Sequence, residues 1–187
     1  NTVWNSAFVY AGVEGQLRDY IHWDATGDYV FLGSQMNDLS VKANARLDLY
    51  PFRRARKSPV SLNVHFETSL EEPEYYYQHY YSNHYKWDND FGKISTTKIQ
   101  GSLNIPRWRI GARVGYALLS GNVYYDSTGV VRQNNSPMSV LSASLDKNFA
   151  LGPVHLDNRL LFQISSDDEV LPLPTLAVNS RLYLQLN

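Results

Sequence analysis

The segment Leu39–Tyr50 alternates apolar and polar residues at every position, and this pattern constrains the fold more than any other feature. Leucine, valine and alanine fill its odd positions, and serine, lysine, asparagine, arginine, aspartate and tyrosine fill its even positions. Side chains of a β-strand point alternately to opposite faces, so the segment predicts a strand with one apolar and one polar face. Its 12 residues exceed the usual length of a globular strand.

The same alternation recurs in 60–70, 98–105, 109–118 and 176–186, and Val9–Trp23 carries one apolar face of an early strand. No segment keeps a helical period. Aromatic residues make up 13% of the chain, with 14 tyrosines, in a polar sequence of mean hydropathy −0.38. Such a composition favours β structure. The sequence predicts an all-β fold, an antiparallel up-and-down meander of about 8–11 long strands.

Two kinds of connection separate these strands. Tight turns with proline, glycine or charged residues are expected near 51–58, 106–107 and 150–153. Long polar loops are expected near 71–92, 120–137 and 165–174. A meander with this rhythm has its turns on one edge and its loops on the other, and residues 1–187 form a single unit. The chain ends in mid-alternation, which is expected both of a finished barrel that ends on a strand and of an excised fragment.

An amphipathic sheet must cover its apolar face. A soluble sandwich covers it with a second sheet, and a membrane barrel covers it with lipid. Strand length and the alternation of turns and loops favour a transmembrane β-barrel or a segment of one. Aromatic residues at strand ends also favour it, because tyrosine and tryptophan gather at membrane interfaces. These residues are Tyr50, Phe52, Tyr75–Trp87, Trp108, Tyr124, Tyr125 and Phe149.

Three stretches resemble the β-barrel porin family of the Bacteroidota type. They are NTVWNSAFVYAGVEGQL, EPEYYYQHYYSNHYKWDNDF and FALGPVHLDNRLLFQISSDDEVLPLPTLAVNSRLYLQ. The resemblance implies a longer barrel in the outer membrane of a Gram-negative bacterium, with a water-filled or partly plugged interior and no catalytic residues. The implied function is passive passage of small solutes or a structural membrane role. The implied partners are the lipid bilayer or lipopolysaccharide, small solutes, and a second copy or another outer-membrane protein.

Charged residues in mid-strand on the polar faces would line the interior of such a barrel. They are Lys42, Arg46, Glu67, Arg113, Asp157, Arg159 and Arg181. Rings of side-chain charge set the ion preference of pores. Two interpretations remain open: the residues tune selectivity, or they are paired structural charges.

The tyrosine-rich stretch EYYYQHYYSNHYKWDND has a different character. Read with a period of two, it places Tyr75, Tyr77, Tyr81, Tyr85 and Trp87 on one face with His79. Both faces mix rings with polar tips, which predicts an interfacial strand or outer hairpin, with stacking on a glycan as the alternative. His79 and His84 point apart in a strand, so no metal site is expected.

Other functions find little support in the sequence. The formal net charge is −1, which does not indicate a nucleic-acid partner, and the basic run Arg53–Lys57 is expected to be a solvated turn or to touch lipid head groups. The chain has no cysteine and none of the common hydrolase, nucleotide or zinc motifs, so we expect neither an enzyme nor a cofactor. The alternatives are a soluble β-sandwich that binds a glycan through tyrosines and, more weakly, a barrel enzyme acting on lipid or peptide. For such an enzyme, His65 with Glu67 and His155 with Asp157 lack a serine partner.

Overall fold

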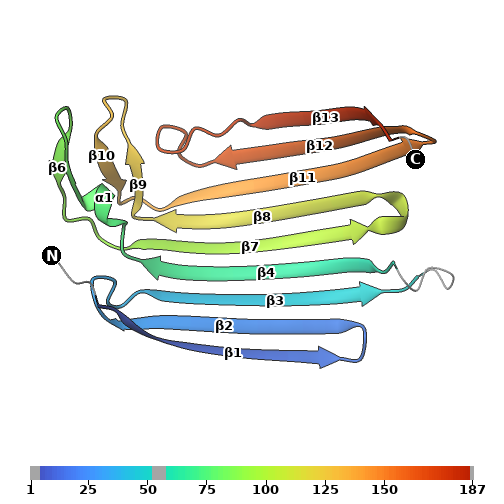
Figure 1. The fold of residues 1–187 in the computed structure, drawn as a ribbon, viewed down its shortest axis with the longest axis horizontal. Coiled ribbons are helices and arrows are strands. Elements are labelled where there is room, and N and C mark those ends of the chain that lie inside the picture. Colours follow the sequence, from blue (N-terminus) through green and yellow to red (C-terminus); the bar gives the residue numbers. More distant parts are fainter. Residues whose placement is uncertain (1–4, 52–57, 186–187) are drawn as a thin grey trace.

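The computed structural model describes residues 5–51 and 58–185. Its main element is a nine-stranded sheet in the order β1-β2-β3-β4-β7-β8-β11-β12-β13 (Figure 1). Every strand pairs antiparallel with its neighbours in this order, which confirms the predicted all-β antiparallel fold. The strands are β1 Ala7–Leu17, β2 Ile21–Leu32, β3 Leu39–Leu49, β4 Val60–Glu71, β7 Ile94–Ile105, β8 Ile110–Ser120, β11 Met138–Leu151, β12 Val154–Ser165 and β13 Leu176–Leu184.

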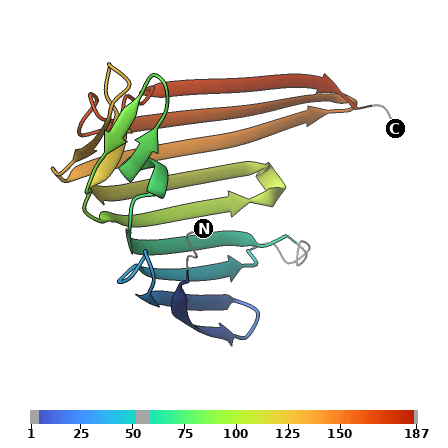
Figure 2. The ribbon, with the colours of Figure 1, turned by 60° about the vertical axis from the view of Figure 1, so that its left-hand side comes forward.

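Two small hairpins stand at one edge of the sheet (Figures 1 and 2). The first follows a one-turn helix, α1 (Tyr75–Gln78), and consists of β5 (His79–Tyr81) and β6 (Lys86–Asp88). The second consists of β9 (Asn122–Tyr125) and β10 (Val131–Asn134). A short 3-10 helix, η1 (Pro106–Trp108), lies at the opposite edge, between β7 and β8.

The connections divide between two edges. We call one the turn edge, which carries the connections 18–20, 106–109 and 152–153 and the facing ends of β3 and β4. The other is the loop edge, which carries 33–38, 72–93, 121–137 and 166–175. The predicted turn near 51–58 falls mainly on residues 52–57, which lie outside the described residues. Phe52 and the basic run Arg53–Lys57 make up this segment.

The single early strand expected over Val9–Trp23 is wrong, because the chain reverses between β1 and β2. Arg18 takes the left-handed conformation (φ 52°) in this turn, where glycine or asparagine is more usual. Leu17 and Ile21 face each other across the hairpin and share the apolar face. The alternation therefore passes through the turn in phase, and no glycine or proline marks the reversal.

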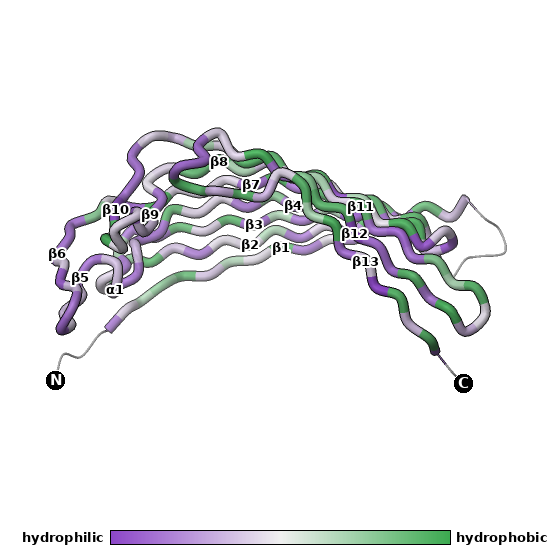
Figure 3. The backbone as a smooth tube through the Cα atoms, turned by 90° about the horizontal axis from the view of Figure 1, so that it is seen from above, coloured by the Kyte–Doolittle hydropathy of each residue, from purple (hydrophilic) through white to green (hydrophobic). Residues whose placement is uncertain are grey.

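Pairing between strands separates the two faces of the sheet. One row on the apolar face runs through Ala43, Phe66, Ile99, Tyr116, Leu141 and Ile164. The sheet is a single curved layer (Figure 3), and large apolar side chains on this face are exposed, as at Val114 (57%) and Val178 (61%). Among the described residues, only Val131 and Met138 are buried hydrophobics. The nine long strands thus enclose no hydrophobic core.

Candidate functional site

The polar face of the nine-stranded sheet brings together all seven charged residues expected to line an interior. Lys42, Arg46 and Glu67 lie on β3 and β4, and the other four lie on β8, β12 and β13. Each has a partner of opposite charge in the structure.

Glu67 organises the centre of the polar face. Its carboxylate lies 3.2 Å from Lys42 Nζ and 3.7 Å from Lys98 Nζ. Lys42, Glu67 and Lys98 occupy facing positions on three neighbouring strands, so the register itself creates this triad. His65 Nε2 lies 3.8 Å from the same carboxylate and contributes a charge only when protonated.

Asp48 lies on the same face near the turn edge and is 5% exposed. Arg46 Nε donates to both of its carboxylate oxygens at 2.9 Å, and Ser61 Oγ donates to Oδ1 at 2.5 Å. Arg46 Nη2 also donates to Ser61 Oγ at 3.3 Å. These contacts, in which one N–H is shared between both carboxylate oxygens, satisfy a largely buried carboxylate and fix Arg46 in place.

A hollow of about 760 Å³ opens on the polar face beside the turn edge. It is lined by residues of β7, β8, β11, β12 and β13, so the polar face is concave across these strands. Four arginines and two aspartates line it, giving a formal charge of +2. They are Arg109, Arg113, Arg159, Arg181, Asp146 and Asp157.

The two aspartates of the hollow engage three of its four arginines. Arg159 Nε donates to Asp146 Oδ1 at 2.5 Å, and Arg181 Nη2 donates to Asp157 Oδ2 at 3.0 Å. Arg113 Nη2 lies 3.7 Å from Asp146 Oδ2, which is buried and accepts no hydrogen bond from any described residue. Arg113 is therefore held by charge alone, and its N–H groups have no acceptor within the described parts of the chain.

Arg109, the fourth arginine, lies in a turn, whereas the other three lie on strands. It follows η1 in the left-handed conformation (φ 51°), and its backbone N–H donates to Pro106 O at 3.1 Å. Its exposed side chain lines the hollow, and no described residue pairs with its guanidinium. The tight turn between β7 and β8 thus adds an unneutralised cation to the hollow.

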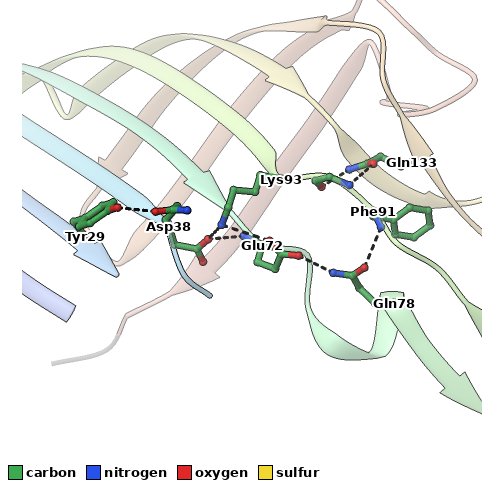
Figure 4. A network of polar contacts seen from close by, with 9 residues as sticks. Tyr29, Asp38, Glu72, Gln78, Phe91, Lys93 and Gln133 are labelled. Carbon is green, nitrogen blue, oxygen red and sulfur yellow. Dashed lines mark hydrogen bonds and ion pairs between the residues drawn. The ribbon is translucent and has the colours of Figure 1, made fainter. Parts of the chain in front are cut away.

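At the loop edge, Lys93 lies between two carboxylates (Figure 4). Its Nζ donates to Asp38 Oδ1 and lies 3.4 Å from Glu72 Oε2. The Glu72 N–H also donates to Asp38 Oδ1 at 2.9 Å, and Gln78 Nε2 donates to Glu72 Oε1 at 2.9 Å. We call Asp38, Glu72 and Lys93 the loop clamp, since they join the β2–β3 connection to the β4–β7 connection.

Gln133 extends this network to the second hairpin (Figure 4). Its Nε2 donates to Gly92 O at 2.6 Å and to Gly121 O at 2.8 Å, while its Oε1 accepts from the Gly92 N–H at 3.0 Å. Asn134 Nδ2 in turn donates to Asp167 Oδ2 at 3.3 Å. The four loop-edge connections are therefore linked from β2 to β13.

The tyrosine-rich stretch is not one strand. Residues 75–78 form α1, and only 79–81 and 86–88 are strands, so the expectation of an outer hairpin fits better than that of a long strand. A period of two would put Tyr80 and Trp87 on opposite faces, but they pair across the hairpin and stack at 4.7 Å. Rings occur at too many positions here for a period of two to place them.

Aromatic contacts join the two hairpins. Tyr77 and Trp87 both approach Tyr125 of β9, with ring centroids 6.0 and 6.4 Å apart. The other predicted aromatics, Tyr75, Tyr81 and Tyr85, are exposed. Their role at the membrane interface or against a glycan stays a prediction. A second hollow of about 620 Å³ lies beside Glu72, Tyr75 and Tyr76.

The turn between β9 and β10 is organised by Asp126. Its Oδ1 accepts from Thr128 Oγ1 at 2.6 Å and from the Thr128 and Val130 N–H groups, and Arg132 Nε donates to its Oδ2 at 2.6 Å. The hydrogen bonds from the Thr128 side chain, from Arg132 and from the backbone hold the pKa of Asp126 well below its usual range. The hydrogen bond and charge of Asp126 raise the pKa of Arg132.

Several residues of the polar face were missed from the sequence. Lys98 and Arg109 stand at polar positions of recognised strands but were not taken as candidates. Asp146 follows the alternation of Leu141, Ala143 and Leu145, which would have placed it on the polar face. Nothing in the sequence pairs Asp38 with Lys93, because they are 55 positions apart and only the folded meander brings them together.

The described residues contain no group of three or more histidine, aspartate or glutamate side chains that could hold a metal ion. His79 Nδ1 instead contacts a single carboxylate, that of Asp88, at 2.5 Å. No helix in 5–51 or 58–185 is long and apolar enough to cross a membrane.

A single curved antiparallel sheet, apolar on one face and charged on its concave face, is typical of the wall of a porin-like β-barrel. The family described as "Putative porin" matches residues 3–187. The chain belongs to this family, which confirms the resemblance carried by the three stretches of sequence. No curated protein and no solved structure matches the chain.

Proposed function

We propose that the protein is a β-barrel of the bacterial outer membrane whose interior passes small solutes. The observation that carries this proposal is the exposed apolar face of the nine-stranded sheet. Exposed valine, leucine, isoleucine and phenylalanine side chains lie on this face from β1 to β13, as at Val13 (60%), Ile99 (50%) and Leu182 (70%). A face of this extent needs a cover, and lipid is the cover that a porin-like sheet meets.

Strand length supports the same proposal. β1, β3 and β8 each have 11 residues. A strand of this length extends about 36 Å, and a tilt of about 40° leaves about 28 Å along the membrane normal, close to the apolar band of known barrels. Tyr20, Trp108 and Phe149 are exposed at the turn edge, where an aromatic girdle belongs.

Closure of the barrel is constrained by strand direction. β1 and β13 border the nine-stranded sheet, and each pairs with one neighbour among the described strands. In an antiparallel sheet with an odd number of strands, the two outer strands run the same way. An all-antiparallel barrel would therefore join β1 to β13 through an odd number of further strands.

The alternatives receive less support. A soluble sandwich needs a second sheet against the apolar face, and the two other sheets within the described residues have two strands each and lie at the loop edge. An enzyme needs a nucleophile or an acid–base pair with a positioning group. His65 contacts Glu67 and Asn44, and His155 stacks on Tyr183 at 5.0 Å, so neither histidine is set beside a serine. We assign the protein no reaction.

Conductance of the intact protein tests the proposal. The protein is extracted in detergent, purified and added to a planar bilayer in potassium chloride. Discrete, reproducible conductance steps are the expected result, together with aggregation when detergent is withdrawn. A monodisperse protein in detergent-free buffer that produces no steps would contradict the proposal and favour a soluble module.

A further inference from the structure

We propose that the hollow beside the turn edge is a binding site for oxyanions, which take the form of carboxylate or phosphate groups on small solutes. This inference deepens the proposed function, because it names the solute class that the polar face would select. It rests on the proposed function only for the passage of the solute. Binding itself can be measured without a pore.

The hollow carries a surplus of cations. Four arginines meet two aspartates around about 760 Å³. Elsewhere on the polar face, Arg46 is tied to Asp48 through a two-oxygen contact, and Glu67 lies within 4 Å of both Lys42 and Lys98. The hollow is where arginine side chains stand together without enough carboxylates to occupy them.

Two arginines of the hollow have side-chain N–H groups that are available to a ligand. Neither Arg109 nor Arg113 donates a side-chain hydrogen bond to any described residue, and Arg113 is 3.7 Å from its nearest carboxylate oxygen. A guanidinium presents five N–H donors in a planar fork that matches carboxylate and phosphate geometry. Each of these forks can take the oxygens of an anion held in the hollow.

Asparagine side chains contribute to the remaining lining of the hollow. Asn104, Asn148 and Asn179 line the hollow on β7, β11 and β13. Their amides can donate hydrogen bonds to an anion and accept them from hydroxyl groups of the solute. Asp146 and Asp157 hold Arg159 and Arg181 in place, so the surface is preorganised on strands rather than on loops.

Inorganic phosphate is the probe for this site. Chloride current through the intact protein is recorded while phosphate is added, and the same detergent-solubilised protein is titrated with phosphate in a calorimeter. The variant Arg109→Gln removes the unpaired cation without leaving a carboxylate unpartnered. We expect its half-blocking concentration and its dissociation constant to rise roughly threefold, the effect of one unit charge across several ångströms of water.

Lys98→Gln is the matched control, with the same charge change on the same face. Lys98 faces Ala117, four positions along β8 from Arg113, a distance of about 13 Å that exceeds the Debye length near physiological salt. Phosphate block and binding should stay within error of the parent protein. Equal effects of the two substitutions, or no phosphate binding to the parent protein, would overturn the oxyanion site. Binding without any conductance would support the site and overturn the proposed pore.

Discussion

The two ends of the polar face use charge in opposite ways. At the loop edge, Lys93 serves two carboxylates, and the side chains of Lys93 and Asp38 are 22% and 11% exposed. At the turn edge, the arginines of the hollow outnumber the aspartates, and the side chain of Arg113 is 49% exposed. One end pairs its cation and encloses it, and the other keeps cations open to water.

This difference separates structural charge from functional charge. A charge that is removed from water must be paired, so the loop clamp stabilises the arrangement of the loops. A charge that stays hydrated costs little when unpaired and can act on a passing ion. The sequence left both interpretations open for the seven polar-face charges. The structure pairs each of them with an opposite charge, and their effect on ion selectivity stays a prediction.

The largest effect is expected from breaking the clamp. Lys93→Met leaves Asp38 and Glu72 together without their cation. Because both are partly enclosed, we expect a loss of about 2 kcal/mol in the free energy of unfolding, below the cost for a fully buried pair. Equilibrium unfolding by denaturant in detergent measures it. Lys86→Met, at an exposed lysine of β6 that has no ion pair with any described residue, is the control and should change little. Equal losses for the two variants would argue against a clamp.

The next effect concerns the hollow. Asp146→Asn removes a negative charge and releases Arg113 and Arg159, so phosphate should bind roughly threefold more tightly. The expected change in phosphate affinity is opposite in direction to that of Arg109→Gln, so the two variants together test whether charge in the hollow controls binding. Phosphate titration by calorimetry measures both. Weaker binding by a folded Asp146→Asn protein would show that Asp146 positions the arginines more than it neutralises them.

A local effect is expected where Gln133 joins the hairpins. Gln133→Ala removes three hydrogen bonds to the backbone of Gly92 and Gly121. We expect a loss of about 1 kcal/mol, confined to the loop edge, since water can replace part of these bonds. Faster cleavage of the 121–137 loop by a protease would report it. Asn135→Ala, a neighbouring exposed position, should leave the cleavage rate unchanged.

The smallest effect is a local dependence on pH. The depressed pKa of Asp126 means that its hydrogen bonds stabilise the β9–β10 turn fully above pH 3.8, its ordinary pKa. This stabilisation is lost as the pH falls through the lower pKa of the folded turn. Protection of the Thr128 and Val130 amide protons, measured against their intrinsic exchange rates, should therefore fall only in strong acid. In Asp126→Asn the exchange should be fast at neutral pH and independent of that titration. An unchanged exchange rate in this variant would refute the role of Asp126.

The long strands and their faces were predictable, because the alternation of apolar and polar residues shows by itself which side chains of a strand share a face. Alternation in Leu39–Tyr50 placed Lys42 and Arg46 on one face, and the same rule placed Arg113 and Arg159. It failed at Arg18, where a short turn preserves the phase of the pattern. It also failed over 75–87, where tyrosines occupy both faces. The clamp and the hollow depend on which strands become neighbours, and alternation within one strand carries no such information.

The most direct test of the account is which face of the sheet meets water. The chain contains no cysteine, so single cysteines can be placed one at a time along β7 without competing thiols. Ser102 and Asn104 lie on the polar face, while Gly101, where a Cβ meets nothing within 4 Å, and Leu103 lie on the apolar face. In liposomes, a water-soluble maleimide should label the cysteines at 102 and 104 and spare those at 101 and 103. Equal labelling at all four positions, or the reverse alternation, would contradict a lipid-facing apolar surface.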